Sequence, residues 1–124
     1  LRRLDTDILD IFLAVTEDRL AEQEITWSDE RAVCVVMASG GYPGSYEKGK
    51  VITGLSDLDD GVVCFHAGTK FGPGGEILTN GGRVLGVTAV GATHEEARAR
   101  AYENVRKIHF DDEYHRSDIG VVYK

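Results

Sequence analysis

The chain has 124 residues, enough for one domain with its own hydrophobic core, and 42% of them are apolar. Its net charge of −7 argues against a nucleic-acid partner and an anionic membrane surface, because both need a basic field. No stretch has the apolar length of a membrane-spanning helix, so we expect no membrane partner.

The N-terminal segment predicts an amphipathic helix over residues 4–22. Apolar residues recur there at helical spacing, at Ile8, Ile11, Phe12 and Val15. Aspartates early in the segment favour the positive end of such a helix.

Two strands and a loop are predicted next. Residues 24–29 (EITWSD) form a short strand candidate, and the valine-rich run 32–39 (AVCVVMAS) predicts a well-buried strand. Residues 40–50 (GGYPGSYEKGK) combine four glycines with a proline, which predicts a loop.

The middle of the chain predicts further short strands, at residues 51–55 (VITGL) and 62–68 (VVCFHAG). Residues 76–82 (EILTNGG) are interpreted as the hairpin partner of a long strand at 83–91 (RVLGVTAVG), because Asn-Gly is a strong hairpin signal.

A second helix is predicted after Thr93, where Thr93 and Glu96 form a capping-box pattern. Its apolar face is expected at Ala97, Ala101, Val105 and Ile108. Two favourable i,i+4 ion pairs are expected on its surface, Glu96–Arg100 and Glu103–Lys107. Short strands with a helix at each end predict an α+β domain with a mainly antiparallel sheet or partial barrel.

The glycine-rich segment 79–91 (TNGGRVLGVTAVG) supports neither a dinucleotide fingerprint nor a P-loop. Both motifs require a helix directly after the glycines, whereas a β-branched strand follows here. A hairpin turn explains the glycines but not Arg83. An arginine beside exposed turn amides can hold a phosphate in a forked contact, although most surface arginines are only solvated.

Other candidate residues have two interpretations each. The loop 40–50 is either a flexible connection or a cover over a ligand, with Tyr42 and Tyr46 at its tip. His66 and Lys70 follow a buried strand, where a histidine is more often a satisfied core residue than a base. The acidic and histidine residues of 109–115 match no zinc or EF-hand spacing, so we expect no metal site.

Cys34 and Cys64 both lie in apolar runs. This pattern favours reduced, buried thiols in a cytoplasmic protein, while a disulfide between the two remains open from the sequence.

Four segments are more specific together than alone: VVMASGGYPGSYEKG, FHAGTK, TNGGRVLGVTAVG and IHFDDEYHRSDIG. In this order they resemble the C-terminal part of the phosphoribosylamine–glycine ligase family, also called glycinamide ribonucleotide synthetases. The resemblance covers nearly the whole chain, and LRRLDTDIL is similar to the family's helix that follows its nucleotide domain.

The resemblance implies an ATP-grasp enzyme of purine biosynthesis that joins glycine to 5-phosphoribosylamine with ATP and Mg²⁺. The family's metal ligands and ATP-binding lysines have no counterpart in this chain, so upstream domains are expected to bind both cofactors. Residues 1–24 would be a connecting helix, the tail of the ATP-grasp domain, and residues 25–124 a C-terminal substrate-site domain. This part alone is expected to hold no catalytic residue and to be inactive.

The resemblance also implies a set of substrate-binding residues. By analogy with related ATP-grasp enzymes, Lys70 and Arg83 would hold the substrate phosphate. The remaining candidates are the turn residues Asn80, Gly81 and Gly82, the loop residues Gly41, Tyr42 and Pro43 over the ribose, and Arg3. The alternative function is a free-standing, non-catalytic binding module that recognises a partner through its GGYPG loop.

Overall fold

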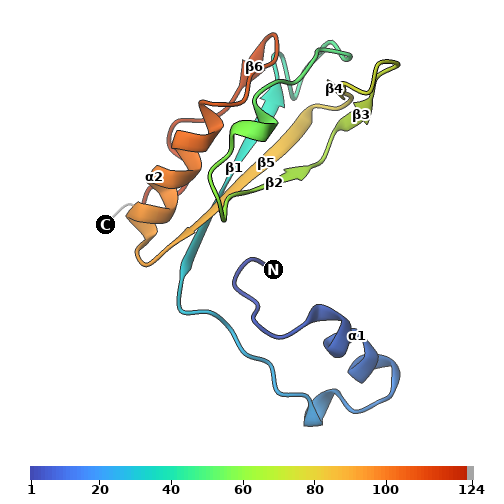
Figure 1. Cartoon of the computed structure of the whole chain (residues 1–124), viewed down its shortest axis with the longest axis vertical. Coiled ribbons are helices and arrows are strands. Elements are labelled where there is room, and N and C mark those ends of the chain that lie inside the picture. Colours follow the sequence, from blue (N-terminus) through green and yellow to red (C-terminus); the bar gives the residue numbers. More distant parts are fainter. Residues whose placement is uncertain (123–124) are drawn as a thin grey trace.

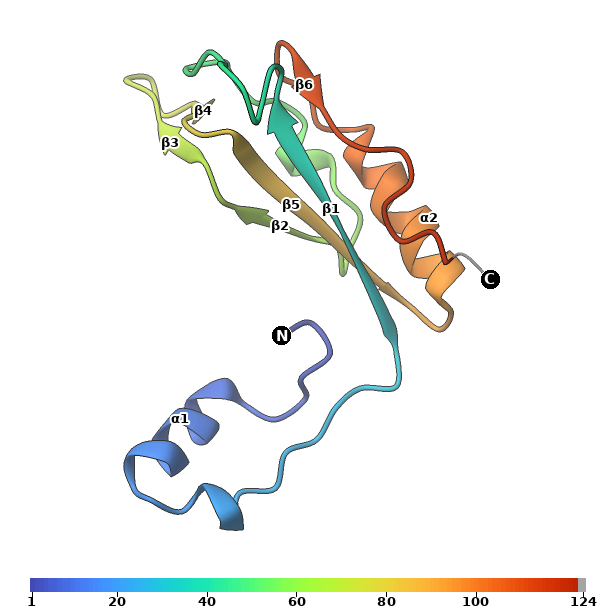
Figure 2. The ribbon, with the colours of Figure 1, turned by 180° about the vertical axis from the view of Figure 1, so that it is seen from behind.

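The computed structural model describes residues 1–122, and its main body is an antiparallel sheet backed by one helix. Figures 1 and 2 show helix α2 lying along one side of the long strands β1 and β5. The helices are α1 (Ile8–Thr16) and α2 (His94–Val105), and the strands are β1 (Arg31–Ser39), β2 (Val63–His66), β3 (Thr69–Phe71), β4 (Ile77–Thr79), β5 (Arg83–Gly91) and β6 (Glu113–Tyr114). The main sheet has the order β2-β5-β1-β6, and β3 pairs with β4 separately. This open antiparallel sheet confirms the predicted α+β class.

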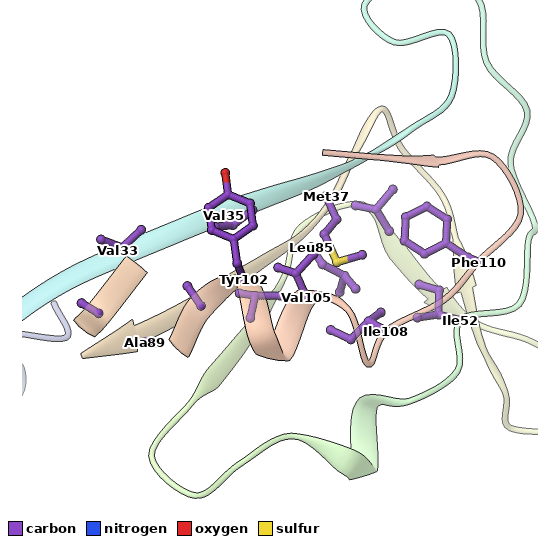
Figure 3. Close-up of a cluster of buried hydrophobic side chains, with 14 residues drawn as sticks. Val33, Val35, Met37, Ile52, Leu85, Ala89, Tyr102, Val105, Ile108 and Phe110 are labelled. Atoms are coloured by element: carbon purple, nitrogen blue, oxygen red, sulfur yellow. The ribbon is translucent and has the colours of Figure 1, made fainter. Parts of the chain in front are cut away.

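The hydrophobic core lies between α2 and one face of β1 and β5 (Figure 3). Every second strand residue faces the helix: Val35 pairs with Val87, Met37 pairs with Leu85, and all four are buried. The helix contributes Ala97, Ala101 and Val105, and Ile108 follows just after its end; all four were predicted for the apolar face and are fully buried or nearly so. Alternation along the strands therefore sends the intervening residues to the other side of the sheet.

That other side, which we call the open face, includes Cys34, Val36, Val63, Phe65, Gly86 and Thr88. Gly86 pairs with Val36 on one side and with Phe65 on the other. Because Gly86 has no side chain, a groove runs between the two apolar neighbours. The side chains of Val36 and Phe65 are 37% and 47% exposed, respectively.

The capping box of α2 forms as predicted. Thr93 Oγ1 accepts a hydrogen bond from the Glu96 amide at 3.1 Å, and the Glu96 carboxylate accepts one from the Thr93 amide at 3.3 Å. The short-range sequence pattern was sufficient here because both partners lie within one helical turn.

The two i,i+4 ion pairs expected on α2 are not found within residues 1–122, because tertiary partners take both cations. Arg100 donates to the carbonyls of Val90 and Asp60 at 2.7 and 3.1 Å. Lys107 Nζ lies 2.7 Å from Asp59 Oδ1. These two cations therefore bind the loop before β2 and do not form ion pairs within the helix.

Asn104 completes this tie from a fully buried position on α2. Its Nδ2 donates to Asp59 Oδ2 at 3.0 Å and to the Arg100 carbonyl at 2.9 Å, and its Oδ1 accepts from the Asp59 amide at 2.8 Å. The hydrogen bonds from Lys107 and Asn104 hold the pKa of Asp59 below its ordinary value of 3.8.

Residues 1–28, which we call the N-terminal lobe, differ from the predicted long helix. Helix α1 covers only Ile8–Thr16, and a short 3₁₀ turn follows at Leu20–Glu22. Asp7 caps the start of the helix, since its side chain accepts a hydrogen bond from the Leu9 amide at 2.8 Å. After the helix, Asp18 has a left-handed φ of 56°, which prevents the helix from continuing. The strand expected at 24–29 is reduced to one bridge, between Leu4 and Trp27.

The predicted hairpin between residues 76–82 and 83–91 is wrong. Strand β4 pairs with β3, whereas β5 pairs with β1 and β2. The glycines allow a close crossing of two backbones instead: a Cβ added to Gly68 would lie 2.8 Å from the Gly81 Cα. The strand predicted at 51–55 is likewise reduced to two bridges, Val51–Leu78 and Thr53–His109.

Residues 116–120 lie along α2 and are held there mainly by hydrogen bonds to their own main-chain groups. Arg98 donates to the carbonyls of Ser117 and Ile119 at 2.7 and 2.9 Å. The Tyr102 hydroxyl donates to the Arg116 carbonyl and accepts from the Ile119 amide at 3.0 Å. Among residues 1–122, no helix combines the length and apolar character needed to cross a membrane.

Candidate functional site

Arg83 begins β5 and lines a hollow of about 510 Å³ at one end of the open face. The open-face residues Val36, Phe65 and Gly86 form its apolar floor, and Gly68, Gly82 and Tyr42 complete the wall around Arg83. Three of the predicted site residues are thus brought together from two segments of the chain: Gly82 with Arg83, and Tyr42.

Tyr42 reaches this hollow from the glycine-rich loop after β1. Its ring packs directly on Gly82, at the place where any side chain on residue 82 would stand. The Tyr46 ring lies edge-on to it, with 6.1 Å between centroids. Gly41 precedes Tyr42 with a φ of 93°, a conformation that only glycine adopts easily. The Tyr42–Pro43 peptide bond is cis.

Ser39, buried at the end of β1, holds the glycine turn in place. Its amide donates to the Gly82 carbonyl and its hydroxyl donates to the Gly81 carbonyl, each at 2.8 Å. Both carbonyls are therefore engaged, while the amides of Gly81 and Gly82 have no acceptor within the described residues. Asn80 differs, because its amide already donates to the Gly68 carbonyl at 2.7 Å, which leaves only its side chain for a ligand.

The Arg83 guanidinium has no hydrogen-bond or ion-pair partner in the part of the chain that the structure describes. The same holds for the side chains of Lys48, Lys70 and Arg106, but Arg83 is the one of these four that lines the hollow. Gly82 lines the hollow with Arg83, whereas Gly81 is the next residue in the chain but does not line it. An unpaired cation on an apolar floor, next to an unpaired glycine amide, is suited to bind an anion.

Lys70 lies in β3, opposite Leu78 of β4, and is not among the residues that line the Arg83 hollow. The chain reaches it two residues after Gly68, which does line the hollow. Figure 1 shows β3 at the same end of the domain as the start of β5.

Arg3 lines a second hollow of about 490 Å³, together with Arg2, Trp27 and Cys34. Phe65 belongs to both hollows, so they adjoin along the open face. Arg3 donates to the Ser28 carbonyl at 3.0 Å, which fixes it within the N-terminal lobe. Gly41 lines a third hollow, beside Asp112 and Glu113.

Sequence reasoning missed the apolar floor of the site. Val36 and Phe65 stand in continuous apolar runs, which hide the alternation that assigns each residue to a face of the sheet. Gly86 was recognised as one of several glycines, but its role as a gap between two strands depends on pairing with β1 and β2.

The remaining candidates have ordinary surroundings. His66 is exposed, not a core residue, and its Nδ1 lies 3.0 Å from Thr69 Oγ1. Both cysteines are free thiols; Cys34 is exposed on the open face, contrary to the expected burial, and burial raises the pKa of Cys64 to about 11. Within residues 1–122, no group of three or more histidine, cysteine or acidic side chains is arranged to hold a metal ion.

Comparison with known proteins gives consistent matches. The family model described as "Phosphoribosylglycinamide synthetase, C domain" matches residues 32–122. The phosphoribosylamine–glycine ligase of Caldanaerobacter subterraneus subsp. tengcongensis is 46% identical over 120 residues, which cover 97% of this chain and 28% of that protein. The enzyme of the same name from Escherichia coli O157:H7 is 47% identical over 120 residues, 95% of this chain and 28% of that protein.

A crystal structure of phosphoribosylamine–glycine ligase from Thermotoga maritima has a similar fold, with a TM-score of 0.70 and 38% sequence identity. The match covers 87% of this chain and 27% of that structure. This chain thus spans less than a third of the length of these relatives, while the family model covers well over half of the chain. The chain therefore belongs to the phosphoribosylglycinamide synthetase C-domain family, a family found in proteins named phosphoribosylamine–glycine ligase.

Proposed function

We propose that this chain is the C-terminal part of an ATP-dependent ligase of purine biosynthesis that joins glycine to 5-phosphoribosylamine. In this proposal the Arg83 hollow binds the phosphate of 5-phosphoribosylamine. The observation that carries it is the unpaired Arg83 guanidinium beside the unpaired amides of Gly81 and Gly82, in a chain of net charge −7.

Each of these groups has a defined role. The planar guanidinium of Arg83 donates two parallel hydrogen bonds to phosphate oxygens, and the glycine amides donate from the side. The Tyr42 ring, on the Gly82 backbone, lies over the ribose together with Gly41 and Pro43. The apolar floor excludes water, which strengthens these charge-assisted bonds.

Lys70, Asn80 and Arg3 are secondary contacts in the proposal. Lys70 is a long, flexible cation that extends toward the phosphate from β3, and Asn80 offers its side-chain amide. Arg3 faces the adjoining hollow, where it would meet the part of the substrate farthest from the phosphate.

ATP and Mg²⁺ are assigned to other parts of the enzyme. Within the described residues no group of metal-ligating side chains is gathered. The chemistry supplied elsewhere would be activation of glycine. We place the enzyme in the cytoplasm, which suits its two free thiols.

The test is Arg83→Ala in the complete enzyme. Charge-assisted hydrogen bonds contribute about 1.5–3 kcal/mol, so the KM for 5-phosphoribosylamine should rise by about 10- to 150-fold, with the KM values for glycine and ATP unchanged. Arg106→Ala is the matched control, since the Arg106 side chain also has no partner within residues 1–122 but is exposed at the end of α2, outside the Arg83 hollow. Normal kinetics with 5-phosphoribosylamine in Arg83→Ala would refute the phosphate assignment.

A further inference from the structure

We propose that Asn80 is a site of spontaneous deamidation, at which the side-chain amide becomes a carboxylate. Asparagine is among the thermolabile residues of proteins. Its loss requires a side chain that water can reach, an uncrowded main-chain nitrogen on the next residue, and no hydrogen bond that fixes either group. The chain contains two asparagines, Asn80 and Asn104, and the structure meets these conditions at Asn80 alone.

The side chain of Asn80 is free in the fold. The residue is exposed, and its side-chain amide has no hydrogen-bond partner within residues 1–122. Only the main-chain amide of Asn80 is engaged, since it donates to the Gly68 carbonyl at 2.7 Å. The side chain can therefore turn toward the following peptide group without losing a contact.

The attacking group is the main-chain nitrogen of Gly81, which has no acceptor among the described residues. The turn is held through other atoms, because the Gly81 carbonyl accepts from Ser39 Oγ at 2.8 Å. Glycine also has no Cβ to crowd its nitrogen. No hydrogen bond therefore has to break before the Gly81 nitrogen approaches Asn80 Cγ.

Asn104 shows the opposite arrangement. It is fully buried, its Nδ2 donates to Asp59 Oδ2 and to the Arg100 carbonyl, and its Oδ1 accepts from the Asp59 amide. The next residue is Val105, whose nitrogen lies inside α2 and beside a β-branched side chain. Deamidation at Asn104 would require the helix to open, so this residue is an internal reference for Asn80.

The reaction needs no reagent other than water. The Gly81 nitrogen attacks Asn80 Cγ, so that an N–Cγ bond forms and the Cγ–Nδ2 bond breaks. The proton lost from the Gly81 nitrogen leaves with the amide group as ammonia. Water then opens the cyclic imide at either carbonyl and gives aspartate or isoaspartate, and no step changes an oxidation state.

Both products would alter the turn that presents Arg83. Each adds one negative charge, and isoaspartate also adds a carbon atom to the main chain. That carbon would stand between two fixed points, since the Thr79 amide donates to the Lys50 carbonyl at 2.9 Å and the Gly82 carbonyl accepts from the Ser39 amide at 2.8 Å. Only the effect on the substrate rests on the proposed function: Asn80→Asp in the complete enzyme should raise the KM for 5-phosphoribosylamine by about 2- to 5-fold.

Peptide mapping of the complete enzyme tests the proposal. Trypsin releases the two asparagines in separate peptides, 71–83 (FGPGGEILTNGGR) and 101–106 (AYENVR). After incubation of the native enzyme at neutral pH and physiological temperature, peptide 71–83 should gain the mass difference between an amide and a carboxyl group. Part of the product should be methylated by an isoaspartyl methyltransferase. Digestion in heavy-oxygen water marks any change that arises during the digest itself.

The same incubation in guanidinium chloride separates the effect of the fold from that of the sequence. Because Asn80 needs no opening, its rate in the native enzyme should lie within about threefold of its rate in denaturant, whereas Asn104 should be at least about 100-fold slower in the native enzyme than in denaturant. A native peptide 71–83 that changes no faster than 101–106 would overturn the proposal, as would a change seen only in denaturant. Normal kinetics in Arg83→Ala would refute the phosphate assignment and leave this result standing, so the two can fail separately.

Discussion

The ring of Tyr42 lies against Gly82 so closely that a Cβ at position 82 would overlap its Cδ2 and Cε2 atoms. This contact links the loop after β1 to the turn that presents Arg83. It also makes the two residues interdependent, because a side chain at position 82 fits only if the Tyr42 ring moves or is removed.

Gly82→Ala should therefore destabilise the isolated chain by about 1–3 kcal/mol through overpacking, while the same change in a Tyr42→Ala background should cost much less. Urea unfolding of the four proteins of this double-mutant cycle measures the coupling. If the effects of the two substitutions on the unfolding free energy are additive, the Tyr42 ring moves aside freely. The ring would then not be a rigid part of the hollow.

Asn104→Leu should lower the unfolding free energy by about 1–3 kcal/mol, because it leaves the Asp59 amide without its acceptor and removes a hydrogen-bond donor from the Asp59 carboxylate. The adjacent Glu103 is exposed, so Glu103→Leu is the matched control and should change stability little. Comparable losses in both variants, measured by thermal unfolding, would contradict a special role for the buried amide.

Asp59 should make stability depend on pH in acid. Its folded pKa is lowered by Lys107 and Asn104, so the ionised carboxylate stabilises the fold above its ordinary value of 3.8. That contribution is lost as the pH falls through the lower folded pKa. The urea midpoints of the wild type and Asp59→Asn should thus differ at pH 7 and converge as the pH is lowered below the ordinary carboxyl value of 3.8.

Asp60→Asn, at the neighbouring exposed position, serves as the control for this pH dependence and should follow the wild type throughout. A difference between the wild type and Asp59→Asn that persists unchanged in acid would show that the side chain acts by hydrogen bonding alone.

The two thiols should react at very different rates. Cys34 is exposed on the open face, whereas burial raises the pKa of Cys64 to about 11 and leaves roughly one thiolate in a thousand at pH 8. Iodoacetamide followed by mass spectrometry should find Cys34 modified first, with Cys64 reacting at a comparable rate only in urea. Equal labelling of the native chain would indicate that β2 opens readily.

Local patterns in the sequence were enough for some elements and misleading for others. The capped helix α2 and the buried strand β1 were predicted because their signals lie within a few residues. The Asn80-Gly81 signal was interpreted as a hairpin, but the backbone of Gly68, distant in sequence, is what these glycines accommodate. Likewise, the cations of α2 found tertiary partners that no helical spacing predicts.

The candidate site shows the same division. Tyr42 and Arg83 were selected from glycine-rich segments, and the fold brings both to one hollow. Val36 and Phe65 were not selected, because a continuous apolar run does not say which residues face a helix and which face a ligand. Only the pairing of β1 and β2 with β5 assigns them to the open face.

Residues 116–120 are held on α2 through their main-chain atoms. The side chains of His94, Arg98 and Tyr102 all form hydrogen bonds with main-chain groups of this segment. These bonds depend on the spacing of main-chain groups, while Ile119 adds a side-chain contact with the core. Substitutions at Ser117 should therefore be tolerated, whereas deleting that single residue would put every later carbonyl out of step with its donor. The length of segment 116–120 is therefore more constrained than the identity of exposed residues such as Ser117.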